Sequence, residues 1–159
     1  MCLRRSAGAL LLGAATAACA SVPRRAGNVE AEAREFMAGY ATDLRTGNRS
    51  AIAGRYDSRG AYMAGRGTKT LASPDSVRAI YNSARWTAPA RFEWHDLSYE
   101  ALGPDAVLVT GRFDWTTAEG RTLPASYTAL LVRRDGHLRI RAEHEDVAPS
   151  ALREQLCRP

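Results

Sequence analysis

Apolar residues follow two different spacings along this chain, and the change between them separates a helical half from a strand half. Between residues 32 and 46 they recur every three or four positions, which places them on one face of a helix. The residues of that face are Ala33, Phe36, Met37, Tyr40, Ala41 and Leu44. Gly47 and Asn48 follow directly, so the pattern predicts an amphipathic helix over residues 32–46.

Two further helices are predicted before the strands begin. A short one is expected over residues 50–55. Another starts at Ser73, whose side chain caps free backbone N–H groups, and continues through Pro74 and the dipole-complementing Asp75 to about residue 82 or 83. Between them, Gly65 and Gly67 lack the further glycines and the strand–loop–helix context of a phosphate-binding loop.

From residue 91 onward apolar and polar residues alternate, which predicts strands. Turn residues at 103–105, 118–120 and 135–136 divide the segment into four antiparallel strands. The first strand places Phe92, Trp94 and Asp96 on one face. The last strand places Leu138, Ile140, Ala142 and His144 on its apolar face, and Arg139, Arg141, Glu143 and Glu145 on the other.

Helices followed by strands indicate an α+β fold, in which N-terminal helices cover one face of an antiparallel sheet. The helix over residues 32–46 has no other surface on which to bury its apolar face. A chain of 159 residues is long enough for one domain with its own core. No run of 18 apolar residues occurs, which excludes a membrane protein with several spans.

The formal net charge of +5 comes from arginine, since the chain has 21 arginines and one lysine. The arginines are scattered and no basic run alternates with aromatic residues, so we expect no nucleic-acid partner. The histidines, cysteines and carboxylates lack the spacing of metal ligands, and the serine-hydrolase elbow is absent. We therefore predict neither a metal nor a cofactor.

The first 20 residues have the three parts of a secretion signal: Arg4 and Arg5, a short apolar stretch over residues 7–18, and small residues after it. Cleavage after Ala18 leaves Cys19 as a lipidated N-terminus, since the Ala-Ala-Cys ending there resembles a bacterial lipobox. Cleavage after Ala20 instead secretes a free protein. Both routes predict an exported protein of the cell envelope or periplasm, and on the first route its only membrane contact is the lipid at Cys19.

We divide the chain into a signal peptide over residues 1–20, a tether over 21–29, one folded domain over 30–148 and a C-terminal tail over 149–159. Within the domain, the helix over 32–46 is followed by Tyr56-Asp57, by the capped helix from Ser73, and by a closing segment in which Ile140 precedes His144. This order resembles the nuclear transport factor 2-like superfamily, which includes SnoaL-like polyketide cyclases and ketosteroid isomerases. The resemblance implies a strongly curved antiparallel sheet that forms a conical pocket, a cystatin-like roll.

The resemblance also implies what lines that pocket: aromatic side chains and one histidine, suited to a small apolar ligand. The predicted ligand-binding residues are Phe36, Tyr40, Tyr62, Trp94, Phe113, Trp115, Tyr127 and His144. His144 is the candidate general base or hydrogen-bond donor, with Asp146 as its carboxylate partner. Tyr40 matches in position the oxyanion donor of the isomerase branch, and Asp96 is the candidate proton shuttle.

Each of these catalytic candidates also has a purely structural interpretation, as a core histidine, a core aromatic or a solvated strand-end carboxylate. Two functions therefore stay open. The first is an exported module that binds a small hydrophobic or amphipathic molecule, or that serves as a dimerisation scaffold. The second is a cofactor-free enzyme of the SnoaL or isomerase type, in which His144 with Asp146 or Asp96 moves a proton next to a carbonyl.

The first function is preferred, because no acid–base pair can be placed on the pocket side from the sequence. Export also argues against a biosynthetic cyclase, whose substrates are normally cytoplasmic. The outward-facing Arg139, Arg141 and Glu143 predict a charged sheet face that pairs with a second copy about a two-fold axis, so we expect a homodimer.

Overall fold

The computed structural model describes residues 26–65 and 67–148. The predicted signal peptide over 1–20, the lipidation site Cys19, the first part of the tether and the tail over 149–159 lie outside the described residues. Those assignments stay predictions. Among the residues that are described, no helix is both long enough and apolar enough to span a membrane.

Three helices precede the long strands, as predicted: α1 (Ala26–Thr46), α2 (Arg49–Gly54) and α3 (Pro74–Asn82). The structure begins α1 at Ala26, so the last part of the predicted tether is helical. The Asn48 side chain accepts a hydrogen bond from the Ala51 N–H at 3.1 Å, which caps α2. Ser73 caps α3 in the same way, accepting from the Ser76 N–H at 3.1 Å.

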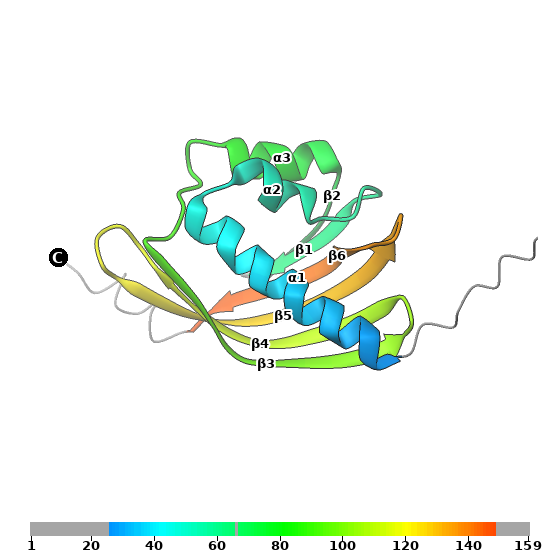
Figure 1. Cartoon of the computed structure of the whole chain (residues 1–159). Helices are drawn as coiled ribbons and strands as arrows, with labels where there is room; N and C mark the ends of the chain where they lie inside the picture. Colours follow the sequence, from blue (N-terminus) through cyan, green and yellow to red (C-terminus); the bar gives the residue numbers. More distant parts are fainter. Residues whose placement is uncertain (1–25, 66, 149–159) are drawn as a thin grey trace, which may run out of the picture.

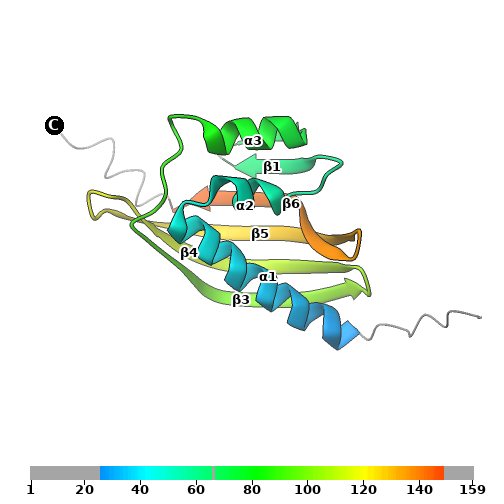
Figure 2. The same cartoon turned by 45° about the horizontal axis from the view of Figure 1, so that its top comes forward.

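The described residues form six strands, and all of them belong to a single sheet. They are β1 (Ala61–Gly65), β2 (Thr68–Ala72), β3 (Arg91–Gly103), β4 (Ala106–Thr116), β5 (Thr122–Arg134) and β6 (His137–Val147). Their order is β2-β1-β6-β5-β4-β3. Figure 2 shows β1, β6, β5, β4 and β3 in this succession. The four predicted strands are present. The short hairpin β1–β2 was not predicted, and β1 runs parallel to β6, so the sheet is mixed rather than purely antiparallel.

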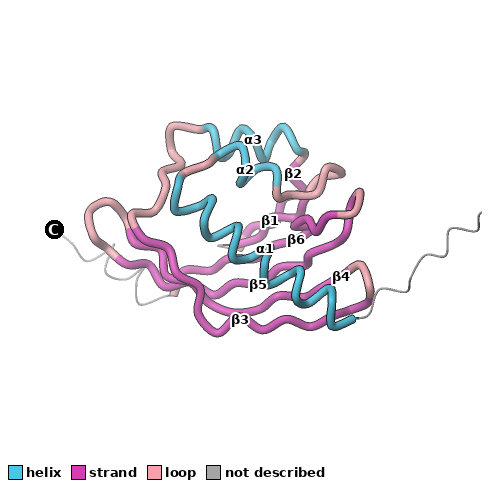
Figure 3. Tube along the Cα trace, in the orientation of Figure 1, coloured by secondary structure: helices cyan, strands magenta, loops and turns pink. Residues whose placement is uncertain are grey.

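All three helices lie on the same side of the sheet (Figure 3), which confirms the α+β fold class. The sheet curves beneath α1, which crosses it, while α2 and α3 lie over the β1 side (Figure 1). The face of α1 that was predicted to be apolar is buried, with Ala33 and Met37 fully inaccessible to solvent. Because this face and one face of the sheet are apolar, burying them against each other forms the core.

Among the described residues the pairing register of the long strands shifts at three places, one of them between Ala101 and Gly103, and the other two are β-bulges near predicted site residues. In β3, Asp96 and Leu97 together lie opposite the single residue Gly111 of β4. In β6, Ile140 pairs with Leu131 and Ala142 with Leu130, which leaves one extra residue, Arg141, between them. An extra residue moves every later side chain to the opposite face of a sheet, so these bulges decide which residues face the helices.

Candidate functional site

The bulge in β6 reverses which faces of the sheet Glu143 and His144 occupy. We predicted that His144 faces the helices and Glu143 the outside, by simple alternation from Ile140. This orientation is wrong, because Arg141 is extra and reverses the alternation after it. Glu143 is only 6% exposed and faces the helices, whereas the His144 side chain is 48% exposed on the other face.

Glu143 is hydrogen-bonded to a cluster of three buried tyrosines from three different segments. The Tyr56 hydroxyl, just after α2, donates to Glu143 Oε1 at 2.6 Å. The Tyr56 oxygen lies 2.5 Å from the hydroxyl oxygen of Tyr81 on α3 and 3.0 Å from that of Tyr40 on α1. The cluster therefore connects the last strand to all three helical segments through one carboxyl oxygen.

The other carboxyl oxygen, Glu143 Oε2, is buried and has no hydrogen-bond partner among the described residues. Burial, and then the negative charge of Glu145, raise the pKa of Glu143 to about 8, although the Tyr56 hydrogen bond acts to lower it. Burial likewise raises the pKa of Tyr56 well above its ordinary value. Near neutral pH this site therefore holds neutral tyrosines beside a carboxyl group that can gain or lose a proton.

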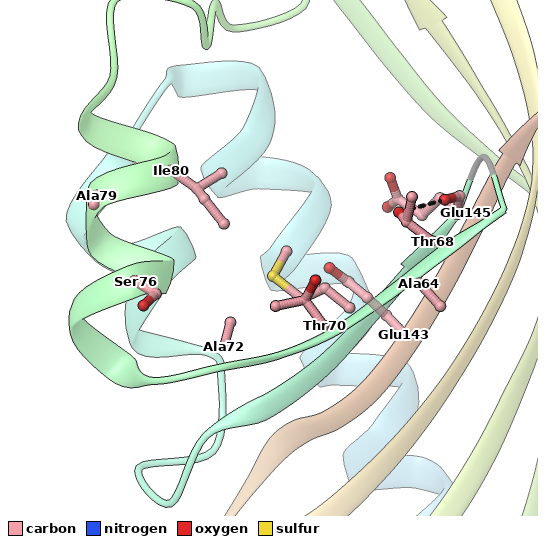
Figure 4. A pocket seen from close by; sticks show the side chains of 11 residues that line it. Ala64, Thr68, Thr70, Ala72, Ser76, Ala79, Ile80, Glu143 and Glu145 are labelled. Atoms are coloured by element: carbon pink, nitrogen blue, oxygen red, sulfur yellow. Dashed lines mark hydrogen bonds between the residues drawn. The ribbon is translucent and has the colours of Figure 1, made fainter.

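A cavity of about 770 Å³ opens beside Glu143, between β6, the β1–β2 hairpin and α3. Its lining residues are Met63, Ala64, Gly65, Thr68, Thr70, Ala72, Ser76, Ala79, Ile80, Glu143 and Glu145. Figure 4 shows the Glu143 side chain reaching from β6 toward Thr70 and the α3 side of the cavity. The walls are mostly apolar, with a few hydroxyl groups and two carboxyl groups, which is the usual composition of a small-molecule site.

Local sequence explains how these walls come together. Parallel pairing of Met63 with Glu143 puts both residues on the same face of the sheet. Gly65 lies so close to β6 that a Cβ there would be 2.4 Å from the Glu145 carbonyl oxygen, so only glycine fits. The capped α3 then covers this edge with Ser76 and Ile80.

The conical pocket that we predicted is filled by its own aromatic side chains. Trp94 and Tyr127 have ring centroids 4.7 Å apart, and Phe113 lies 5.6 Å from Trp94. Tyr40, Phe113 and Tyr127 are buried in the core, and Phe36, Trp94 and Trp115 pack against it. These six residues therefore belong to the core, and none of them lines the cavity beside Glu143.

The remaining predicted residues lie on the outer face of the sheet. Tyr62 is 37% exposed and lines a shallow hollow of about 370 Å³ together with His144. The predicted pairing of His144 with Asp146 is present, with 3.1 Å between Nε2 and Oδ2, but it faces away from the helices. Asp96 was placed on the face of Phe92 and Trp94 as a candidate proton shuttle, with a solvated strand-end carboxylate as the other interpretation. The bulge in β3 turns it outward, where a hydrogen bond from Arg112 lowers its pKa.

The homodimer was predicted from an outward ladder of Arg139, Arg141 and Glu143. Since Glu143 faces the helices, that ladder does not exist, and Arg141 instead donates to the Gly60 carbonyl at 2.5 Å. The homodimer itself stays a prediction. In the part of the chain that the structure describes, no group of three or more His, Cys, Asp or Glu residues is placed to hold a metal ion.

Sequence reasoning missed Glu143, Tyr56 and Tyr81 as site residues. After Ile140, charged residues occupy both faces of the strand, so hydrophobic alternation no longer marks the buried side. A single signal was present: Tyr56 lies in the segment that carries the family resemblance. No feature of the sequence indicates that its hydroxyl meets a carboxyl 87 positions later.

The fold is similar to several solved structures. One is a nuclear transport factor 2-like protein of unknown function from Pseudomonas putida, with 17% identity over 76% of this chain and 87% of that chain, and a TM-score of 0.66. Another is a cystatin-like protein of unknown function from Nostoc punctiforme, with 14% identity over 76% and 91%, and a TM-score of 0.62. A third is a type 2 hexachlorocyclohexane dehydrochlorinase, with 17% identity over 76% and 85%, and a TM-score of 0.61.

These similarities confirm the predicted resemblance at the level of the fold: the chain has the nuclear transport factor 2-like fold. No protein-family model matches the sequence, and neither does any curated protein. Since one fold hosts many functions, the function has to be argued from the cavity and its residues.

Proposed function

We propose that this protein binds a small, largely apolar molecule in the cavity beside Glu143, and that the Glu143 carboxyl holds the polar group of that molecule. One observation carries the proposal. Glu143 lines the cavity, and its Oε2 atom is buried without a hydrogen-bond partner among the described residues. A buried polar atom without a partner is costly, so a ligand that supplies the missing partner gains binding free energy there.

The remaining walls suit such a ligand. Met63, Ala72 and Ile80 offer apolar contact, while the Thr70 and Ser76 hydroxyls offer weak polar contact. The volume of about 770 Å³ lies within the range of small-molecule sites. The tyrosine cluster fixes the Glu143 carboxyl from behind, so the carboxyl is held in place before the ligand arrives.

A thermal-shift screen of the full chain against small amines, alcohols, ketones and carboxylic acids tests the proposal. A compound that binds only the folded state raises the unfolding midpoint by mass action. We expect such a compound to raise the midpoint of the wild type and to lose most of that effect in Glu143→Gln and in Ile80→Trp. The second variant fills the cavity from α3 and leaves both carboxyl groups unchanged.

Two matched controls separate binding from general damage. Glu35→Gln removes an exposed carboxylate from α1, and Leu102→Trp enlarges an exposed apolar residue outside the cavity. Both controls should respond to the compound like the wild type. A compound that shifts Ile80→Trp and Glu143→Gln as much as the wild type would show that binding takes place elsewhere.

A second function, cofactor-free proton transfer, is favoured by one observation. Glu143, whose pKa is about 8, shares the cavity with a second carboxyl group, that of Glu145, and a pair of carboxyl groups can act as acid and base. A structural neighbour with this fold is named a dehydrochlorinase. Ketones found in the screen distinguish the two functions: an enzyme exchanges their α-protons for deuterium in D₂O, detected by NMR, and a binding protein leaves them unchanged.

A further inference from the structure

The cavity beside Glu143 is acidic, although the chain as a whole carries a formal net charge of +5. Of its described lining residues only Glu143 and Glu145 are ionisable, and neither lysine, arginine nor histidine is among them. The two glutamates are two positions apart on β6 and therefore share a face of the sheet. When the Glu143 carboxyl is ionised, no described lining residue of the cavity supplies a positive charge to it.

The titratable groups that face the Glu143 carboxyl supply no positive charge to it. The titratable residues facing its carboxyl are Glu145 on the same strand and four tyrosines: Tyr40 on α1, Tyr56 after α2, Tyr81 on α3 and Tyr127 on β5. Burial raises the pKa of each tyrosine above its ordinary value, so all four stay neutral. A hydroxyl from this cluster already occupies Oε1, and Oε2 has none.

We propose that the ligand is an organic cation, a primary or secondary ammonium on an apolar body, whose N–H donates to Glu143 Oε2. This inference rests on the binding function proposed above and adds the chemical class of the ligand. The ammonium supplies both the hydrogen-bond donor that Oε2 lacks and the positive charge that the described walls lack. The apolar body lies against Met63, Ala79 and Ile80, which line the same cavity.

The two other ligand classes fit less well. A carboxylate ligand is repelled by the ionised Glu143 carboxyl. A neutral acceptor such as a ketone needs the protonated form of Glu143, so its affinity falls as pH rises through about 8. An ammonium needs the ionised form, so its affinity rises over the same range. The direction of the pH dependence therefore identifies the class of ligand.

Three probes with one carbon skeleton test this inference: phenethylammonium, 2-phenylethanol and phenylacetate. Their affinities for the full chain are measured by isothermal titration calorimetry between pH 6 and pH 8, where the ammonium stays protonated. We expect phenethylammonium to bind at least about tenfold more tightly than 2-phenylethanol at pH 8. Its affinity should rise by up to about tenfold per pH unit as Glu143 loses its proton, while the affinity of the uncharged alcohol changes less.

Glu143→Gln should reduce the affinity for phenethylammonium to that of the alcohol and remove its pH dependence, whereas Glu35→Gln should change neither. If 2-phenylethanol or phenylacetate binds as tightly as the ammonium, and Ile80→Trp blocks that binding, the cavity binds ligands but the inference about charge is wrong. If none of the three probes binds the wild type at millimolar concentrations, the inference and the proposed function both fail.

Discussion

Two buried carboxyl groups, Asp57 and Glu143, have opposite surroundings in the described part of the chain. Asp57 is 1% exposed and fully partnered, since its Oδ2 accepts from Arg134 Nε at 3.0 Å and its Oδ1 from the Arg59 N–H at 3.0 Å. Glu143 is partnered on one oxygen only. The first arrangement is that of a structural residue, and the second leaves a carboxyl oxygen for a ligand.

Asp57→Ala should therefore destabilise the protein strongly. The substitution leaves Arg134 without its buried partner and removes the connection between the α2–β1 segment and β5. We expect the free energy of unfolding to fall by about 2–4 kcal/mol, measured by urea denaturation. The control is Asp75→Ala, which breaks an exposed ion pair with Arg78 and should cost less than about 1 kcal/mol. Equal losses would show that the Asp57 contacts contribute nothing beyond a surface pair.

At the scale of the elements, the bulges in β3 and β6 change which side chains of each strand face the helices. In β3 the extra residue brings Leu97 over Gly111, where a Cβ would be 2.7 Å from the Leu97 side chain and 3.0 Å from the His95 carbonyl oxygen. In β6 the extra residue turns Glu143 inward. A glycine opposite the bulge of β3 and a reversed alternation after the bulge of β6 thus determine which side chains face the helices.

Gly111→Ala should destabilise the protein, because the new methyl group meets the backbone of the bulge as well as a side chain. We expect a loss of about 1–3 kcal/mol in the free energy of unfolding. Gly54→Ala is the matched control, since nothing lies within 4 Å of a Cβ at that position, which is in α2. Alanine there should leave stability unchanged or raise it by up to about 1 kcal/mol. A Gly111→Ala variant as stable as the wild type would mean that the bulge adapts freely.

The same elements show how far the sequence predicts the structure. The helices and the four long strands follow from apolar periodicity, from the Ser73 cap and from the Asp135-Gly136 turn, where both residues have the positive φ angles of 49° and 82° that such a turn requires. The hairpin β1–β2 was not predicted because both strands are short and β2, the edge strand, is largely exposed. The bulges escaped because alternation assumes that no residue is extra.

The candidate site was less predictable than the fold for a physical reason. Tyr40 was singled out as a core aromatic or an oxyanion donor, and it lies in the buried tyrosine cluster. Glu143 was assigned to the solvent by alternation from Ile140, and its charge agreed with that assignment because charged residues are normally exposed. Its burial depends on one extra residue in β6 and on hydroxyl groups from α1, α3 and the segment after α2, which only tertiary structure brings together.

At the scale of the whole molecule, the cavity lies beside the core rather than inside it, although Ala72 belongs to both. Aromatic side chains fill the space between α1 and the sheet, and Phe92 and Trp94, with centroids 4.8 Å apart, lie at its centre. The cavity lies on the same face of the sheet, over its β1–β2 side and beneath α3 (Figure 4). Ligand binding there therefore does not require the aromatic core to open.

The burial of Glu143 should be measurable in the stability of the whole chain. Its pKa is about 8 in the folded protein and near the ordinary value of 4.5 in the unfolded chain. Between these values the folded state binds more protons, so the free energy of unfolding falls as pH rises, by up to about 1.4 kcal/mol per pH unit. Urea denaturation from pH 5 to pH 8 should show this decline in the wild type and in Glu35→Gln.

In Glu143→Gln the contribution is absent, so this variant should become more stable relative to the wild type as pH rises. Other titrating groups act equally on both proteins and cancel in the difference between their free energies of unfolding. A difference that stays constant from pH 5 to pH 8 would mean that Glu143 ionises normally in the folded protein. A growing difference means that the folded chain gives up stability to keep this carboxyl buried, as expected for a group retained for binding rather than for folding.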